Sequence, residues 1–514
     1  MKNLLSEYSA FVTEPFNEKL IKAKTSVDIE KECRVIFKSL ETIPGIHVNS
    51  VKLYTNEENI KPIFQEDSMY KQVTDTRTNR LHYSVSIDEI SGTIENDINI
   101  LKIVDDYFFV NDGVLYYPIW QVTPIFSYHT HNGIVLKNLS NPFTIIKNKD
   151  FSASPCFGGQ LVEHIPTYNV LLFKKSISML YFFMARYAIE SLENSGISIY
   201  QDSAAFESYQ DSKIIDHFNK LLGTDIKFSD DPTELNESNR TVFQQGNDGI
   251  AFSIHDSDVE TPMGKFVISL LLNSEKFTGK TTKKILTFNY KDLITPWFWV
   301  SELAKYFVRG TDCIKRRNKA KGIFISLDRL IDPITKESMP IEDKYKVDAF
   351  SLMLYVVEHF SELIQIDNSD LKYMKLSLYE FMLFPLRLYI NRKINDLLSQ
   401  QTITADDKKK IFNKLNPMFL IKALVNDEKA LIRTYNSSNF ISLFTAGLSA
   451  TLASPQSVSS NIPVKSRDLK ESFVGRISII RSSPSNPGML VTLCPMCTLY
   501  TKHKYFEDYS KKHI

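Results

Sequence analysis

Apolar residues recur at helical spacing near the start of the chain and at alternating spacing after it. Between residues 28 and 40 most apolar side chains share one helical face, and Pro44 and Gly45 end the pattern. This spacing predicts an amphipathic helix. From 47 to 145 the apolar runs become short, β-branched and aromatic, with Asn-Asp-Gly or Pro between them. These runs predict a sheet built of hairpins.

Longer helical patterns follow this sheet. Residues 177–192 form the most apolar one, and Gly196 shortly after it suits a helix C-terminus. Beyond Val347 the spacing predicts helices over 349–364, 371–398 and 406–415, and a further short helix from Pro417. The order of elements predicts a mixed α+β, multidomain protein.

Two segments are too polar to form a core of their own. Residues 225–248 have few apolar side chains and many turn formers, which predicts an exposed loop. Residues 436–468 are rich in Ser, Asn and other small residues, which favours loops packed against another element. We expect function in this second segment.

Composition narrows the class of protein. With 514 residues the chain is long enough for about three domains, and 43% hydrophobic and 24% charged residues are typical of a globular protein. Five cysteines cannot build a disulfide framework, so we expect a reducing compartment, the cytoplasm. The N-terminus lacks a signal-peptide pattern, and residues 177–192 are too short and too charged to span a bilayer, so no membrane contact is expected.

Most signatures of catalysis are absent from the sequence. There is no Walker or dinucleotide-binding glycine pattern and no GxSxG motif. No tight cluster of aspartates is present to hold a pair of magnesium ions. His129 and His131 with Cys156 and His164, and the Cys494 to Cys497 CxxC, have spacing too loose or too incomplete for a zinc site.

Basic residues gather in two places, although the net charge is only +1. Lys315 to Lys321 (KRRNKAK) is a charge run that suits either phosphate binding or a solvated loop. The second window follows the Ser-rich segment and contains five cations opposed by two acids. Such a surface suits positioning a nucleic-acid strand without reading its bases, or a layer of interdomain ion pairs. Its cations are Lys465, Arg467, Lys470, Arg476 and Arg481.

This second window contains a recognisable motif. The string RDLKESFVGR, residues 467–476, resembles RDVHPTHYGR of the β subunit of multisubunit DNA-dependent RNA polymerases. Upstream, NSSNFISLF at 436–444 resembles that family's GSSQLSQFM, the loop beside the RNA path and the rifampicin pocket. Glu380, Arg387 and Arg392 resemble a further helical segment, and 416–429 resembles PQDLINAKPISAAVKE. The order of these partial matches is that of the family.

The resemblance covers mainly 367–493, with a weaker match at 107–121, where YFFVNDGVLYYPIWQ resembles FVINGTERVIVSQ. Two departures change local contacts. The family's PIETPEGPNIGL is replaced at 479–490, where Arg481 stands near the family's Glu. The basic HKRRLSALGPGGL segment is replaced by LASPQSVSS at 452–460. We therefore expect the assembled enzyme to be insensitive to rifampicin.

The resemblance implies the amino-terminal half of a β subunit, with protrusion, lobe and fork-like regions. We expect a protrusion-like part at 1–150, a lobe-like insertion at 151–364, a helical return at 365–435 and a fork-like end at 436–514. A β subunit continues through parts that this sequence does not contain, which implies a divided subunit of the kind found in large-genome bacteriophages.

The resemblance also implies a role and a set of partners. The chain would shape the DNA channel and the RNA–DNA hybrid wall, without a catalytic residue or metal of its own, while another subunit holds Mg²⁺. Expected partners are a C-terminal β chain, β′-like chains, template DNA, transcript RNA and a promoter-specificity subunit, in the cytoplasm of an infected bacterium or in the virion. The expected nucleic-acid-facing residues are Ser437, Ser438, Asn439, Ser442, Lys465, Arg467, Lys470, Arg476 and Arg481.

Two alternatives of other classes remain open from the sequence. A viral structural or adaptor protein without nucleic-acid binding suits the near-zero net charge and the 34 Phe and 24 Tyr. A metal-dependent enzyme would use His129, His131 and the Cys494 and Cys497 pair.

Overall fold

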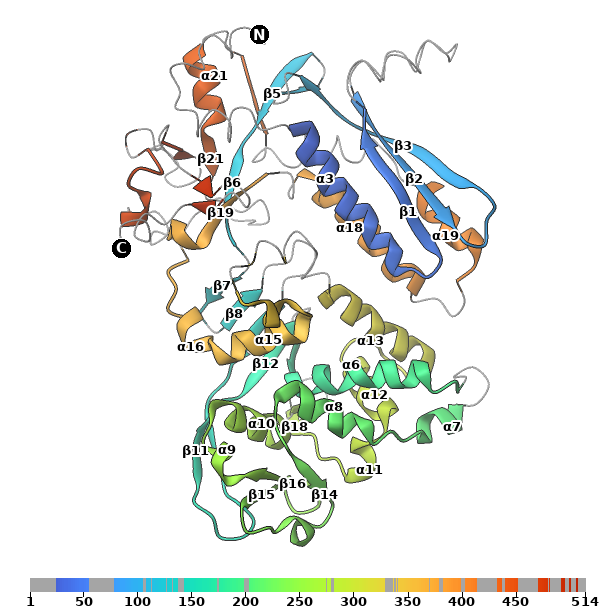
Figure 1. The fold of residues 1–514 in the computed structure, drawn as a ribbon, viewed down its shortest axis with the longest axis vertical. Helices are drawn as coiled ribbons and strands as arrows, with labels where there is room; N and C mark the ends of the chain where they lie inside the picture. Colours follow the sequence, from blue (N-terminus) through green and yellow to red (C-terminus); the bar gives the residue numbers. More distant parts are fainter. Residues whose placement is uncertain are drawn as a thin grey trace. The chain divides into compact units, whose positions relative to one another are not determined.

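The fold was analysed in a computed structural model (Figure 1). It describes residues 25–54, 78–104, 108–111, 113–125, 127–131, 133–136, 143–172, 175–197, 203–273, 275–278, 282–328, 336, 339, 341–368, 370–378, 382–398, 403–413, 432–436, 440–451, 470–478, 480, 491–494, 499–500 and 505–506. The mixed α+β, multidomain architecture predicted from the sequence is confirmed.

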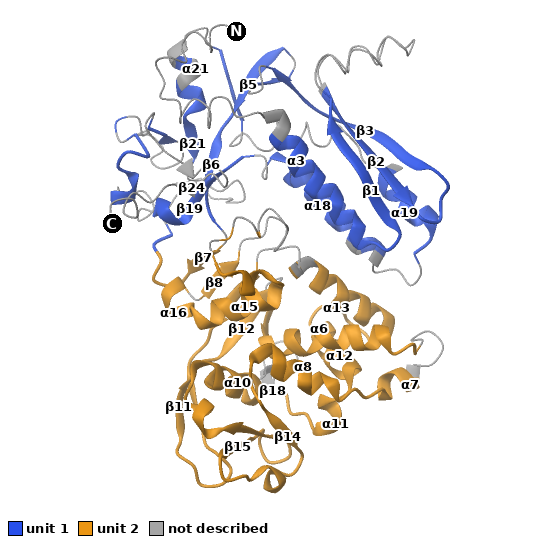
Figure 2. Ribbon diagram, in the orientation of Figure 1, with its two compact units in different colours: residues 1–126, 367–398, 402–514 blue, residues 127–366, 399–401 orange. Residues whose placement is uncertain are grey.

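The chain divides into two compact units (Figure 2). Unit 1 contains residues 1–126, 367–398 and 402–514, and unit 2 contains 127–366 and 399–401. The first division therefore falls after residue 126, where the sequence places one near 150. The reason is sheet pairing, because the strand that ends at Pro124 pairs within unit 1, whereas the strand that begins at Ser127 pairs within unit 2.

The first sheet of unit 1 has the strand order β1-β2-β3-β4-β5-β20, and its neighbouring strands are antiparallel. As predicted, successive hairpins build most of it. The strands are β1 (Ile46–Leu53), β2 (Thr78–Ile87), β3 (Thr93–Val104), β4 (Phe108–Asn111), β5 (Val114–Pro118) and β20 (Ile432–Thr434).

Helices pack on this sheet. The predicted first helix is present as α3 (Thr25–Lys38), extended by the 3₁₀ turn η3 (Ser39–Thr42), and it packs on β1. Figure 1 shows α3 and α18 (Phe384–Leu398) side by side. Tyr83 on β2 is buried between the Phe37 ring of α3, at 4.8 Å between centroids, and the Phe412 ring of α19 (Ala405–Asn413), at 5.9 Å.

The second sheet of unit 1 joins segments that are distant in the sequence, in the order β22-β21-β6-β19-β24-β23. The predicted helix over 371–398 is partly wrong, because 371–373 form the 3₁₀ turn η7 (Leu371–Tyr373) and the next residues form β19 paired with β6. The strands are β6 (Trp120–Pro124), β19 (Met374–Ser377), β21 (Ser449–Thr451), β22 (Val491–Thr492), β23 (Leu499–Tyr500) and β24 (Tyr505–Phe506).

Unit 2 combines small sheets with helices. Its five-stranded sheet has the order β13-β12-β9-β8-β7, and β10 pairs with β11. The strands are β7 (Ser127–Thr130), β8 (Gly133–Leu136), β9 (Phe143–Lys147), β10 (Phe151–Ala153), β11 (Val162–Ile165), β12 (Tyr168–Leu172) and β13 (Lys175–Ser178).

The predicted apolar helix is α6 (Met179–Asn194), which lies in the core of unit 2. Ser178 caps its first turn by accepting a hydrogen bond from the Leu180 amide, and the ring of Tyr181 meets Trp299 of α12 edge-on. Other helices of this unit include α7 (Ser203–Ser208), α8 (Lys213–Leu222), α9 (Asp256–Val259), α10 (Pro262–Leu272), α11 (Tyr290–Leu293), α12 (Pro296–Lys305), α13 (Cys313–Asp328), α15 (Ala349–Glu358) and α16 (Phe360–Leu363).

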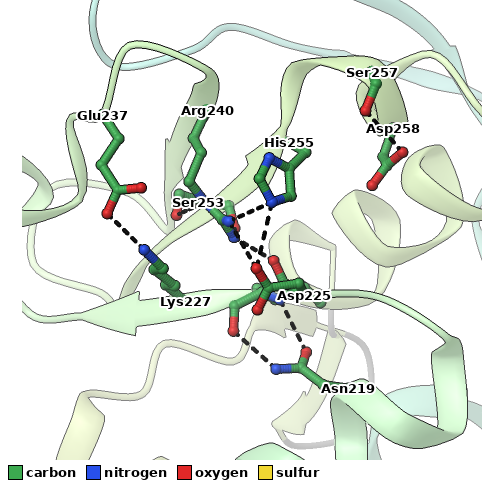
Figure 3. A network of polar contacts seen from close by, with 10 residues as sticks. Asn219, Asp225, Lys227, Glu237, Arg240, Ser253, His255, Ser257 and Asp258 are labelled. Atoms are coloured by element: carbon green, nitrogen blue, oxygen red, sulfur yellow. Dashed lines mark hydrogen bonds and ion pairs between the residues drawn. The ribbon is translucent and has the colours of Figure 1, made fainter.

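The prediction of an exposed loop over 225–248 is wrong. This segment contributes β14 (Lys227–Ser229) and β15 (Arg240–Gln244) to a three-stranded sheet with β16 (Ala251–His255). Apolar side chains of the segment, Leu235, Val242 and Phe243, are buried, and Figure 3 shows that a network of polar contacts also holds it. The Arg240 side chain is 1% exposed; it donates to Asp225 Oδ2 at 2.9 Å and to Ser253 Oγ at 3.0 Å.

In the part of the chain that the structure describes, no helix combines the length and apolar character needed to cross a bilayer.

Candidate nucleic-acid interface

The segment that contains the polymerase-like motif forms a tight turn in unit 1. Of residues 465–481, the structure describes 470–478 and 480. The 3₁₀ turn η10 (Glu471–Phe473) begins it, and Gly475, with a φ of 71°, reverses the chain. This left-handed conformation favours glycine, because a Cβ atom would strain it. The turn places Arg476 at its end.

Two cations of the motif hold this turn. Arg476 is 6% exposed, and its Nη1 donates a hydrogen bond to the Ser472 carbonyl oxygen at 3.0 Å. The Nζ of Lys470 lies 3.0 Å from Oδ2 of Asp367, and the Lys470 side chain is 29% exposed. Arg476 therefore faces the inside of the turn, whereas Lys470 lies at its rim.

Backbone hydrogen bonds lock the turn onto its neighbours. The amide of Ser478 donates to the Thr492 carbonyl at 2.8 Å, and the amide of Cys494 donates to the Arg476 carbonyl at 2.8 Å. In addition, the Ser472 hydroxyl accepts a hydrogen bond from the Leu371 amide at 3.2 Å. The motif is thus fixed to β22 on one side and to η7, just before β19, on the other.

The Ser-rich segment enters the same sheet. Helix α21 (Phe440–Gly447) carries Ser442, which is half-buried, and leads into β21. Strand β21 pairs in parallel with β6, with Ala450 opposite Trp120. One layer therefore contains β6, which begins where the 107–121 match ends, and β21, which follows the 436–444 match; the described motif residues 470–476 are bonded to the same layer.

The predicted nucleic-acid-facing residues are only partly described. Lys470 and Arg476 lie in the motif turn, and Ser442 lies on α21, which leads into β21. The predicted residues that lie outside the described part of the chain are Ser437, Ser438, Asn439, Lys465, Arg467 and Arg481. The role of the whole set in nucleic-acid binding stays a prediction.

One face of the second sheet is polar, a feature that sequence reasoning missed. Pairing places Ser377 opposite Gln121 and Lys375 opposite Thr123, and Thr451 also lies opposite Gln121. Directly paired side chains project from the same face. All five are less than 10% exposed, and the Thr123 and Ser377 hydroxyls lie 2.9 Å apart. The alternation of apolar and polar residues in WQVTP (120–124) and MKLS (374–377) could have indicated this polar face.

Apolar side chains are exposed beside the motif turn. Val474 is 68% exposed and Ile480 is 96% exposed, and Tyr373 of η7 is exposed by 37%. The turns η7 and η10 are in contact. Exposed apolar residues next to a buried, hydrogen-bonded turn are typical of a surface that meets another protein chain.

The alternative metal site receives no support from the described residues. His129 lies on β7, and His164 lies on β11 with a positive φ of 55°. No group of three or more His, Cys, Asp or Glu side chains suited to a metal ion occurs among the described residues. Burial raises the pKa of the Cys156 and Cys494 thiols, which disfavours the thiolate that metals bind. Cys497 lies outside the described residues.

Comparison with protein-family models gives a match. No curated protein matches the chain. A family model described as non-virion RNA polymerase subunit matches residues 1–511, nearly the whole sequence.

Proposed function

The chain belongs to the non-virion RNA polymerase subunit family, and from this premise we propose that it is the amino-terminal part of a divided β-type subunit. In this role it shapes the DNA channel and the RNA–DNA hybrid wall of the assembled enzyme. Phosphoryl transfer takes place in the assembly, with Mg²⁺ held by another subunit. This chain contributes by positioning nucleic acid.

The observation that carries the proposal is the convergence of the family-like segments on β6. Strand β6 begins where the weak match at 107–121 ends, and it pairs with β19 on one side and with β21 on the other. The motif turn at 470–478 is bonded to β22 and η7 of the same layer. Similarities that are scattered along the sequence thus become neighbours in space, as a single binding surface requires.

Within this layer we assign different tasks to the cations. Arg476 holds the turn through Ser472, since its guanidinium is nearly excluded from solvent. Lys470 lies at the rim, where an ammonium group can meet a phosphate. We further propose that Ser442 and the predicted residues outside the described part of the chain complete the nucleic-acid-facing set.

The partners follow from membership in a polymerase. We propose contacts with a C-terminal β-type chain, with β′-like chains and with a promoter-specificity subunit, in the cytoplasm of an infected bacterium. The exposed Val474, Ile480 and Tyr373 suit a contact with one of these chains, because their burial would remove apolar surface from water.

Affinity purification of the tagged chain from its native source tests the proposal. We expect β-like and β′-like polypeptides in equal amounts by mass spectrometry, and template-dependent RNA synthesis by the purified complex. Recovery of the chain alone, or with capsid proteins and without RNA synthesis, would contradict the β-type assignment. A Val474→Asp variant should lose partners while folding normally, whereas Val347→Asp, at an equally exposed valine of unit 2, should not.

A further inference from the structure

A concentration of positive charge lies in unit 2, apart from the motif turn. Between residues 309 and 321 the sequence has six cations and one acid, in a chain whose 61 cations nearly equal its 60 acids. The structure folds the cationic run into the first half of helix α13, so the alternative of a solvated loop is wrong. The cations are Arg309, Lys315, Arg316, Arg317, Lys319 and Lys321.

This arrangement is unfavourable for the helix itself. The amino-terminal end of a helix carries partial positive charge and is stabilised by anions. Here Asp312, just before α13, accepts from the Ile314 and Lys315 amides, but the first turn itself has no acidic residue. Lys315 and Lys319 lie four residues apart, as do Arg317 and Lys321, and like charges at this spacing repel. The stability of α13 therefore does not explain why these cations are clustered.

In the described part of the chain, both acids and neutral acceptors lie beside this charge. The Nζ atom of Lys315 lies 3.3 Å from Oδ2 of Asp312, and the Nζ atom of Lys321 lies 2.6 Å from Oε1 of Glu193, near the end of α6. The guanidinium of Arg316 instead meets neutral acceptors, the Gly310 carbonyl and the Ser301 hydroxyl. Glu207 of α7 also faces this helix and accepts from the Cys313 thiol. Asp312, Glu193 and Glu207 are thus three described acids beside six cations.

The exposed cations are spaced so that they can contact successive charges of a polyanion. Arg309, Lys315 and Lys319 are exposed, and the Lys315 side chain reaches 72% exposure. Lys315 and Lys319 share one helical face and are separated by about 6 Å along the axis. Phosphates of one DNA strand follow one another at about 3.4 Å of axial rise. The two ammonium groups can therefore contact phosphates of the same strand.

We propose that the surface formed by Arg309 and the first half of α13 binds the phosphate backbone of duplex DNA. This inference rests on the proposed polymerase function but adds a second contact, in a different unit from the motif turn. Residues 309–321 contain no aromatic side chain. Proteins that hold single strands stack bases on aromatic rings, so the absence favours a duplex. The contact is electrostatic and independent of base sequence.

The test measures binding of a duplex DNA probe by the purified full-length chain over a range of salt concentrations. We expect Lys315→Gln with Lys319→Gln to weaken binding and to reduce the slope of log K against log salt by about 0.9 for each lost contact. Lys315→Arg with Lys319→Arg, which retains both charges, should bind like the wild type. Lys291→Gln with Lys344→Gln is the matched control, because both lysines are exposed in unit 2 and Lys344 also has an acidic neighbour, Glu342.

The outcomes separate the alternatives. Equal losses in the control pair would show an effect of overall charge alone and would overturn the proposal, as would an unchanged salt slope in the α13 variant. A single-stranded RNA probe that depends on Lys315 and Lys319 more than the duplex does would also overturn it. Because this test uses the isolated chain, a lack of DNA binding can be told apart from a failure to assemble with polymerase subunits.

Discussion

Arg476 Nη1 donates a hydrogen bond of 3.0 Å to the main-chain oxygen of Ser472, and so closes the turn that contains the polymerase-like motif. The hydroxyl of the same serine accepts from the Leu371 amide. Ser472 thus links the motif turn to η7 and β19. A side chain predicted to meet nucleic acid thus also shapes the loop.

Replacing Arg476 with alanine should destabilise the protein. The substitution removes a charged hydrogen bond at a site that is 6% exposed, for which a loss of about 1.5–3 kcal/mol is typical. Urea unfolding of the purified chain measures the change. Arg433→Ala, at an exposed arginine of β20, is the control and should leave the midpoint nearly unchanged. Equal stability of the Arg476→Ala and Arg433→Ala variants would show that Arg476 has no structural role.

Replacing Gly475 with alanine should also destabilise the turn. Its φ of 71° disfavours a residue with a Cβ atom by about 1–2 kcal/mol. No heavy atom lies within 4 Å of a Cβ built there, so the effect comes from the backbone alone. Gly475→Asn should be milder, because asparagine tolerates this conformation better. Thermal unfolding distinguishes them, and an asparagine variant less stable than the alanine variant would contradict this explanation.

The buried hydroxyl pair of the second sheet should show energetic coupling. Thr123 and Ser377 lie 2.9 Å apart and are 3% exposed. Thr123→Val and Ser377→Ala should each destabilise, whereas the double variant should lose less than the sum, with a coupling of about 0.5–1.5 kcal/mol. A double-mutant cycle measured by urea unfolding gives this value. Additive losses would show that the two hydroxyls do not bond to each other.

Asp225 should contribute to acid sensitivity. The hydrogen bond from Arg240 lowers the pKa of Asp225 below its usual value. A carboxyl whose folded pKa is lowered contributes stability above its unfolded pKa, near 3.9, and loses it as pH falls through the folded pKa. Asp225→Asn should therefore reduce stability at pH 7 and flatten its decline below about pH 4.

Urea midpoints of the wild type and Asp225→Asn between pH 7 and pH 3 measure this difference. Asp248→Asn, at an exposed carboxyl on the turn between β15 and β16, serves as the control and should follow the wild type. Parallel curves for the wild type and Asp225→Asn would show that Asp225 does not contribute to the acid dependence.

Local signals predicted local structure well. Helical spacing and Pro44 with Gly45 predicted α3 and its end, and apolar continuity predicted α6. The Arg240 network was missed because Asp225, Arg240 and Ser253 come from three segments, and a polar composition looks like a loop until these contacts are known. The Thr123 and Ser377 contact spans 254 residues, which no periodicity detects.

At the candidate interface, too, the sequence does not reveal which side chains are in contact. Motif order pointed to the segments 436–444 and 467–476, but not to the pairing of β21 with β6. The orientation of a cation depends on its contacts, which short matching strings do not give. Arg476 and Lys470 have the same charge and lie six residues apart, yet one is buried against Ser472 and the other lies at the rim beside Asp367.

Lys470 and Asp367 provide the sharpest test of the nucleic-acid interface. The ammonium and carboxylate lie 3.0 Å apart, with the lysine 29% and the aspartate 51% exposed, so the ion pair itself should stabilise the fold by at most about 1 kcal/mol. If Lys470 meets a phosphate in the assembled enzyme, Lys470→Gln should weaken nucleic-acid binding and reduce its salt dependence. Asp367→Asn should do the opposite, because it removes the acid that competes with the phosphate. Binding of a labelled template–transcript hybrid by the assembled polymerase measures both effects, with Lys372→Gln, beside Asp370 on η7, as the control. A purely structural ion pair would instead make both variants slightly less stable and leave hybrid affinity unchanged in each.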